Sequence, residues 1–182
     1  MTLPMARSVV ARYLRANYAA QHPVVAKHRA LLDELGLKVE MDGESISLIP
    51  KDPAARRALP QSQMLDAGTA GQIMLSRVLR KDRMTQEGLD DLEGLRQQLR
   101  RKGLQAQAVT FVRVRPELKG KGLGSVLYEI ALYNAHDGFG TATQCALVPA
   151  SAMGSSTSDE ADRVWKSLAR KHPHVGVAIV YK

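Results

Sequence analysis

The passage from Ala106 to His136 constrains the fold more than any other part of the chain. It opens with the apolar run "AQAVTFVRVR", whose β-branched residues predict a strand over 106–115. A turn with glycines at alternate positions follows, and "VLYEIALYNA" then predicts a helix over 123–136. A strand that leads through a short turn into a helix is the building unit of a sheet covered by helices.

The rest of the C-terminal half repeats this alternation. The sequence "TSDE" at Thr157–Glu160 forms a capping box, in which a hydroxyl and a carboxylate satisfy each other's backbone N–H groups. The predicted elements are a strand over 142–148, a helix over 158–171 and a strand over 175–181. Strands that alternate with helices imply a sheet that is at least partly parallel.

The N-terminal half has a different pattern. Asp42–Gly43 is typical of a tight hairpin turn, and alternating apolar residues flank it on both sides. Residues 50–70 contain three prolines and a glycine, and they predict a long loop. The remaining predictions are helices over 6–18, 23–35 and 85–102 and strands over 37–41, 44–49 and 72–79. We therefore expect one α+β domain spanning 1–182, with 1–36 as an N-terminal helical elaboration.

Charge and composition limit the classes of partner and cofactor. The net charge of +8 favours anionic partners, but no block of Lys or Arg marks a dedicated nucleic-acid-binding arm. Cys145 is the single cysteine, so neither an internal disulfide nor a cysteine-based zinc site is expected, and no metal is predicted. No apolar run reaches about 18 residues, so no membrane span is predicted. With no secretion signal visible either, we expect a cytoplasmic protein.

The glycine turn has the chemistry of an anion site. A helix N-terminus leaves about four backbone N–H groups unpaired and carries about half a positive charge. Glycines let an anion approach the backbone closely, and Lys119 and Lys121 add positive charge. The spacing G-x-G-x-G is neither that of a P-loop nor that of a dinucleotide-binding fingerprint. A basic loop without a ligand would have the same composition.

The segment "VRVRPELKGKGLGSVLYEIAL" resembles motif A of the GNAT superfamily of N-acetyltransferases. In that motif a strand ends in a Pro–Glu step, here Pro116–Glu117, and leads through a glycine loop into a helix. Lys119 stands where the family usually has arginine or glutamine. The resemblance implies a three-layer α/β/α GNAT-like fold with a mixed central sheet, and it implies that 106–172 is the acetyl-CoA-binding core.

The same resemblance implies how acetyl-CoA would bind. Backbone amides of the glycine loop would hold the pyrophosphate, and the end of the strand would pair with the pantetheine arm. Acetyl-CoA is a co-substrate in this family, and an amide of the strand polarises the thioester carbonyl. The implied cofactor-binding residues are Val112, Arg113, Val114, Lys119, Gly120, Lys121, Gly122, Leu123, Gly124 and Ser125.

The catalytic residues are not evident from the sequence. The family often has a tyrosine as proton donor on the helix after the second strand, and Trp165 stands there instead. We interpret Trp165 as a packing residue, because it lies in that helix's apolar stripe. Ser155, Ser156 and Tyr133 are the weak candidates for proton transfer. The short C-terminus also departs from the family, which usually closes with two strands.

These features predict an acetyl-CoA-dependent N-acetyltransferase that acts on a primary amine. The acceptor could be a small amine, a protein amine or an aminoacyl-tRNA, and the N-terminal helices could pair in a homodimer. Two alternatives remain. One is a coenzyme A-binding module without transfer activity, and the other is a basic nucleic-acid-binding protein whose turn holds backbone phosphate.

Overall fold

The computed structural model describes residues 19, 21–42, 45–62, 65–76, 97, 101, 105–137, 145–148 and 158–171. The chain divides into two compact units, which are described separately below. Unit 1 comprises 1–72 and 113–127, and unit 2 comprises 73–112 and 128–182. The predicted helices over 6–18 and 85–102 and the predicted strand over 175–181 lie outside the described residues, apart from Gln97 and Arg101.

The described elements confirm an α+β chain with a mixed sheet. The strands are hydrogen-bonded in the order β1-β2-β3-β4-β5. Strands β1 and β2 pair antiparallel, with Leu37 opposite Pro50 and Asp42 opposite Ser45, whereas β4 and β5 pair parallel. The strands are β1 (Leu37–Asp42), β2 (Ser45–Pro50), β3 (Gly71–Ser76), β4 (Gln105–Val114) and β5 (Cys145–Val148). The three-layer arrangement remains a prediction.

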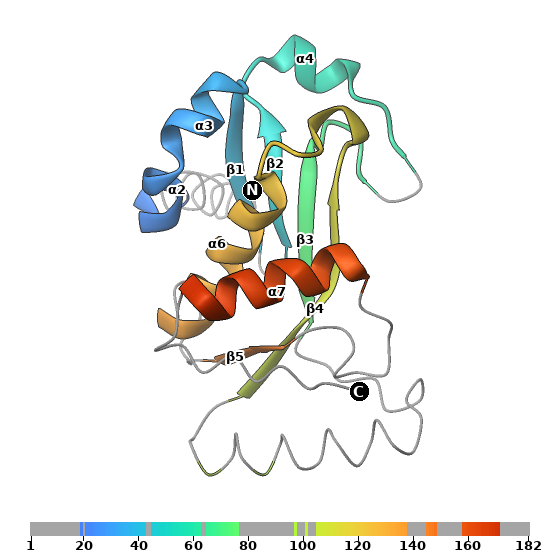
Figure 1. Ribbon diagram of the computed structural model, residues 1–182. Helices are drawn as coiled ribbons and strands as arrows, with labels where there is room; N and C mark the ends of the chain where they lie inside the picture. The colour runs from blue at the N-terminus through green and yellow to red at the C-terminus, as the bar shows by residue number, and fades with distance from the viewer. Residues whose placement is uncertain are drawn as a thin grey trace, which may run out of the picture. The chain divides into compact units, whose positions relative to one another are not determined.

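In unit 1, two short helices replace the single helix predicted over 23–35. Helices α2 (Pro23–Lys27) and α3 (Arg29–Glu34) are separated by His28, whose φ of −99° and ψ of 13° depart from helical values. His22 caps α2, because its Nδ1 accepts a hydrogen bond from the Val24 N–H at 3.2 Å. Figure 1 shows both helices beside β1.

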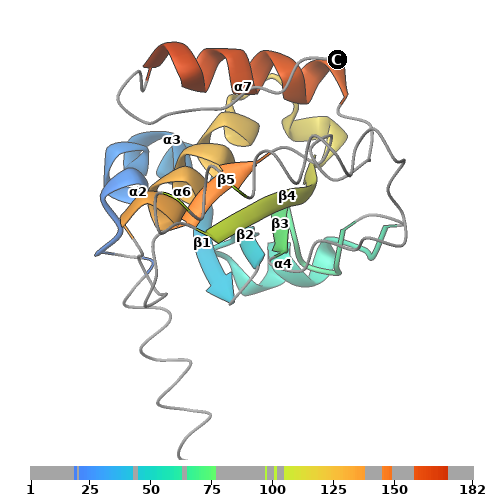
Figure 2. The same ribbon diagram turned by 90° about the horizontal axis from the view of Figure 1, so that it is seen from below.

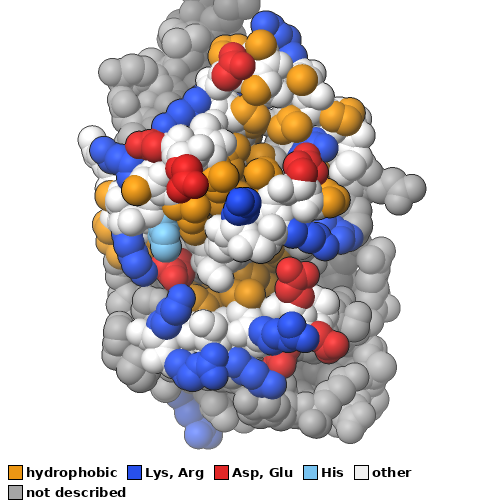
Figure 3. All heavy atoms as spheres, turned by 45° about the horizontal axis from the view of Figure 1, so that its top comes forward, with side chains coloured by type: hydrophobic (Ala, Val, Ile, Leu, Met, Phe, Trp, Pro, Cys, Tyr) orange, Lys and Arg blue, Asp and Glu red, His pale blue; other side chains and the backbone are white. Residues whose placement is uncertain are grey.

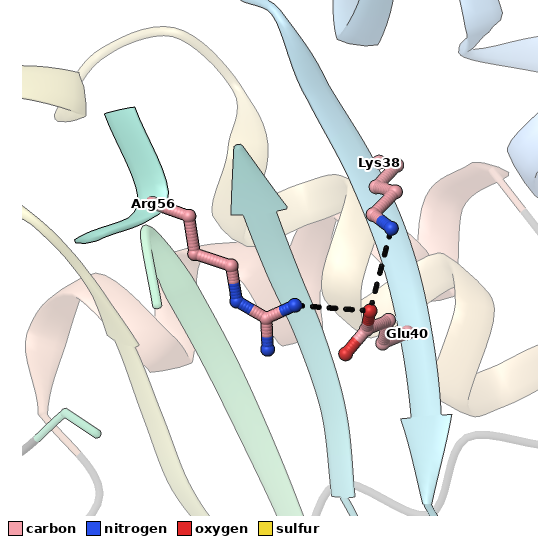
Figure 4. Close-up of polar contacts among 3 residues, drawn as sticks. All are labelled: Lys38, Glu40 and Arg56. Carbon is pink, nitrogen blue, oxygen red and sulfur yellow. Dashed lines mark hydrogen bonds and ion pairs between the residues drawn. The ribbon is translucent and has the colours of Figure 1, made fainter. Parts of the chain in front are cut away.

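The predicted loop over 50–70 contains a helix, α4 (Pro53–Ala58). Asp52 caps it by accepting hydrogen bonds from the Ala54 and Ala55 N–H groups at 3.0 and 3.1 Å. Arg56 of α4 forms an ion pair with Glu40 of β1 at 3.5 Å, and Lys38 reaches the same carboxylate (Figure 4). All three side chains are about half exposed, so these ion pairs contribute little stability.

In unit 2, β4 and β5 pair from Gln105–Cys145 to Ala108–Val148. Beyond Ala108, β4 continues without a partner in the described part of β5. Figure 2 shows β5 beside β4. Helix α7 (Asp159–Lys171) buries Trp165 and Leu168, and helix α6 (Leu123–Asp137) passes from unit 1 into unit 2.

Each unit has its own apolar core. Buried apolar residues of unit 1 include Leu32, Leu37, Val39, Ile46, Leu48, Ile49, Leu123, Val126 and Leu127. Those of unit 2 include Ile73, Leu75, Ala108, Val109, Tyr128, Ile130, Ala131, Leu132, Trp165 and Leu168. The strand and helix that flank the glycine turn are therefore anchored by burial, while the turn itself is exposed.

Candidate anion-binding site

The turn between β4 and α6 begins with a tight 3-10 segment. After Arg115 the chain forms the 3-10 turn Pro116–Leu118, in which the Leu118 N–H donates to the Arg115 carbonyl at 3.0 Å. The Lys119 N–H donates to the Pro116 carbonyl at 3.2 Å. These bonds turn the chain sharply at the end of the strand and lead directly into the glycines.

Two of the three glycines have backbone angles that other residues avoid. Gly120 and Gly122 have φ values of +76° and +79°, in the left-handed region. A Cβ atom built at Gly120, Gly122 or Gly124 would meet no atom within 4 Å. The backbone conformation therefore requires glycine at two of these positions, and the space beside all three is open.

Several N–H groups of the turn have no backbone acceptor among the described residues. Val126 donates to the Gly122 carbonyl at 3.2 Å, which begins the hydrogen-bonding pattern of α6. Within the described part of the chain, no backbone acceptor is found for the N–H groups of Gly120, Gly122, Leu123, Gly124 and Ser125. No acidic residue lies in the first turn of α6. Unpaired N–H groups at the N-terminus of a 15-residue helix are a favourable site for an anion.

Lys119 and Lys121 carry positive charge on either side of Gly120. Both side chains are exposed, and neither forms an ion pair with a described residue. Flexible exposed ammonium groups attract a phosphate without fixing its orientation. We refer to the turn Pro116–Gly122 together with the first residues of α6, Leu123–Ser125, as the cradle.

The cations on the face seen in Figure 3 do not form one continuous basic patch, because Asp and Glu side chains lie among them. This distribution agrees with the sequence, where the net charge of +8 is spread along the chain. A duplex-binding surface would be expected to present its cations together. The face seen in Figure 3 does not have this arrangement.

Among the described residues, no group of three or more His, Cys, Asp or Glu side chains could hold a metal ion. None of the described helices is long and apolar enough to cross a membrane.

The catalytic candidates are not brought together. Tyr133 is half-buried on α6 and already has an interaction partner. Ser155 and Ser156 lie outside the described residues. The cofactor-binding candidates fall into two groups: the cradle residues, and Val112–Val114 at the end of β4. Only the cradle has a geometry that points to a ligand.

The interpretation of Trp165 as a packing residue is confirmed. Trp165 is buried and packs edge-to-face on Tyr128, with 5.2 Å between ring centroids. Burial raises the pKa of Tyr128 to about 12, and the polar influence of the adjacent Trp165 indole opposes this rise in part. Neither residue is exposed for proton transfer to a leaving group in solution.

Sequence reasoning missed Arg115, which lies between the strand and the cradle. Its guanidinium is buried and donates hydrogen bonds to the carbonyls of Thr69 and Pro60. The available sequence signal was an arginine immediately before a proline and a glycine turn. That signal does not identify its hydrogen-bond partners, because they are distant in sequence.

Comparisons with known proteins give one distant structural likeness. No protein-family model matches the chain, and no curated protein sequence matches it. Among solved structures, a ribosomal-protein-alanine N-acetyltransferase from Brucella melitensis biovar Abortus 2308 aligns over 91% of this chain and 86% of that chain, with 13% identity. The TM-score is 0.34, which is too low to establish a shared fold.

Proposed function

We propose that the protein is an acetyl-CoA-dependent N-acetyltransferase of GNAT-like fold that acetylates a primary amine. The cradle carries this proposal, because it combines left-handed glycines with N–H groups and lysines that have no partner among the described residues, all at one helix N-terminus. Coenzyme A offers a pyrophosphate, which suits such a site. Residues 112–125 also resemble GNAT motif A, and this resemblance is the reason for proposing acetyl-CoA as the ligand.

In this proposal acetyl-CoA lies along the end of β4, with its pyrophosphate at the cradle. The N–H groups of Gly120 and of residues 122–125 bind the pyrophosphate, and backbone groups of Val112, Arg113 and Val114 pair with the pantetheine arm. The amine nitrogen attacks the thioester carbonyl carbon while an amide of β4 stabilises the developing oxyanion. The C–S bond then breaks, coenzyme A leaves as the thiolate, and the amine loses its proton to a base or solvent.

Calorimetric titration of acetyl-CoA tests the binding step. The variant Gly122→Asp places a carboxylate in the cradle, and Gly36→Asp is its matched control. Gly36 also has a positive φ, +62°, and a Cβ there would also meet no atom within 4 Å. We expect micromolar binding for the wild type and Gly36→Asp and none for Gly122→Asp. No binding by the folded wild-type protein would refute the proposal.

A second candidate is a coenzyme A-binding module without transfer activity, and buried Trp165 favours it, since the family's usual tyrosine is missing. Release of free coenzyme A thiol in the presence of small amines, peptides and aminoacyl-tRNA separates the two functions. Thiol release with any acceptor supports the transferase. Binding without release from acetyl-CoA supports the module.

A further inference from the structure

Arg115 is a buried charged residue immediately before the cradle. It is only 7% exposed, and its Nε and Nη2 donate to the Thr69 and Pro60 carbonyls at 2.7 and 2.6 Å. Its backbone N–H donates to the Ala70 carbonyl at 2.9 Å. One residue thus makes three hydrogen bonds to the segment 60–70.

Burying the charged Arg115 side chain costs solvation free energy. A guanidinium does not lose its proton in a protein, so a buried one keeps its full charge. No carboxylate pairs with it in the described part of the chain, where its side-chain acceptors are the neutral carbonyls of Thr69 and Pro60. Hydrogen bonds from a charged donor to carbonyls are short and strong, which fits the observed distances. Among the described residues, these two bonds are what offsets the cost of burying the charge, so they hold the side chain firmly in place.

The segment that Arg115 binds is itself firmly attached to unit 1. The Ala70 N–H donates to the Leu48 carbonyl of β2 at 2.8 Å, and the Gly68 N–H donates to the Leu59 carbonyl at 2.9 Å. Gly68 also lies against Arg56 of α4, because a Cβ there would approach the Arg56 Cγ to 2.8 Å. Figure 1 shows α4 and the turn after β4 at the same end of the unit 1 strands.

The cradle has little support of its own. A Cβ atom built at Gly120, Gly122 or Gly124 would meet no atom within 4 Å, so no neighbouring group packs against these residues there. On the helix side the cradle is anchored by the burial of Leu123 and Val126. On the strand side the residue that precedes the 3-10 turn is Arg115. The position of the unpaired N–H groups therefore depends on how firmly Arg115 is held.

We infer that Arg115 is a positioning residue whose buried guanidinium fixes the cradle against the segment 60–70. Anion affinity at the cradle then depends on the two hydrogen bonds from Arg115 to the Thr69 and Pro60 carbonyls. This inference rests on the proposed function, because coenzyme A is the anion considered. Arg115 is not expected to touch the substrate. Its loss should raise the KM for acetyl-CoA and leave kcat within about twofold, since ground-state and transition-state binding are lost together.

The test compares Arg115→Met and Arg115→Lys with Leu32→Ala, a remote variant of unit 1 that removes buried apolar volume from α3. Coenzyme A affinity is measured by calorimetry at a temperature where all variants are folded. We expect at least a tenfold loss for Arg115→Met and less than a twofold change for Leu32→Ala. Equal affinity in Arg115→Met and Leu32→Ala would overturn the inference.

Arg115→Lys keeps the inference testable if Arg115→Met does not fold. A lysine keeps the charge but presents a single ammonium, so it cannot reproduce the fork between the Pro60 and Thr69 carbonyls. We expect a loss of at least threefold in coenzyme A affinity. A lysine variant that binds like the wild type would contradict a positioning role.

Limited trypsin digestion gives a readout that needs no ligand. Lys119 and Lys121 are exposed in the cradle, so a loosened cradle should be cleaved faster after them. We expect at least fivefold faster cleavage there in Arg115→Met than in Leu32→Ala. If the wild-type protein binds no coenzyme A, the proposed function fails, and this comparison still decides whether Arg115 holds the cradle. Equal cleavage rates would show that it does not.

Discussion

Alanine substitutions at Gly36, Gly122 and Gly124 should separate the stability of the chain from its affinity for coenzyme A. Gly36 and Gly122 have φ values of +62° and +79°, and an alanine Cβ would meet no atom within 4 Å at either. Placing alanine in the left-handed region destabilises the folded state by about 1–2 kcal/mol. Replacing glycine also lowers the entropy of the unfolded chain, which stabilises the folded state by about 0.4–1 kcal/mol. Both variants should therefore lose about 1 kcal/mol of unfolding free energy, which lowers Tm by about 2–4 °C in a chain of this size.

Gly124 should behave in the opposite way. It lies in the first turn of α6, its φ is not positive, and a Cβ there also meets open space. Alanine is favoured over glycine in a helix by about 0.5–1 kcal/mol, so Gly124→Ala should be more stable than the wild type. Its methyl group nevertheless projects into the space that an anion must enter to reach the N–H groups.

Urea unfolding and calorimetric titration of coenzyme A measure the two effects in the same preparations. We expect Gly122→Ala and Gly124→Ala to bind at least tenfold more weakly, which corresponds to about 1.4 kcal/mol. Gly36→Ala should bind within twofold of the wild type. Full affinity in the stabilised Gly124→Ala variant would refute the reasoning, as would equal losses of affinity in Gly36→Ala and Gly122→Ala.

Three further predictions concern stability. Burial raises the pKa of Tyr128 from 10.0 to about 12, so the folded state keeps a proton that the unfolded chain loses between pH 10 and 12. The unfolding free energy should fall by about 3 kcal/mol as the pH rises through that window, and urea titrations of Tyr128→Phe should lack this loss. Gln107 is 5% exposed, and its side-chain amide has no hydrogen-bond partner in the described part of the chain, so Gln107→Met should keep or raise Tm. Gln72→Met should instead lose about 1 kcal/mol, because the Gln72 amide donates to Ser45 Oγ at 2.9 Å, and equal melting shifts would contradict both expectations. Asp52→Ala removes the cap of α4 and should cost about 1 kcal/mol, with faster tryptic cleavage after Arg56; an unchanged rate would argue against the cap.

Elements whose residues alternate or repeat on a buried face could be predicted from the sequence. The alternating residues on both sides of Asp42–Gly43 predicted β1 and β2 to within a residue or two of their bounds. Helix α4 was missed because it has no buried residue, so no apolar stripe marks it. Asp52–Pro53 was the available signal, since Asp caps helices and Pro favours the first helical position. The break at His28 was hidden because the apolar spacing continues across it.

The cradle could be predicted because its chemistry depends on residues adjacent in sequence. Glycines at alternate positions, flanking lysines and a following helix all lie within Lys119–Ser125. The role of Arg115 could not be predicted in this way, because its two carbonyl partners lie 46 and 55 positions away. Nothing in the local pattern distinguishes a buried arginine that donates to distant carbonyls from an exposed one.

A cradle made of peptide N–H groups places few demands on side-chain identity. Only Gly120 and Gly122 are fixed by their backbone angles, and Lys119 and Lys121 are exposed and unpaired in the described structure. A deep mutational scan with a binding selection should therefore give glycine-only positions at 120 and 122, a preference for glycine at 124 where the anion enters, and broadly permissive positions at Lys119 and Lys121. A site of this kind can survive extensive sequence drift, because the atoms that hold the anion are the same in every amino acid except proline.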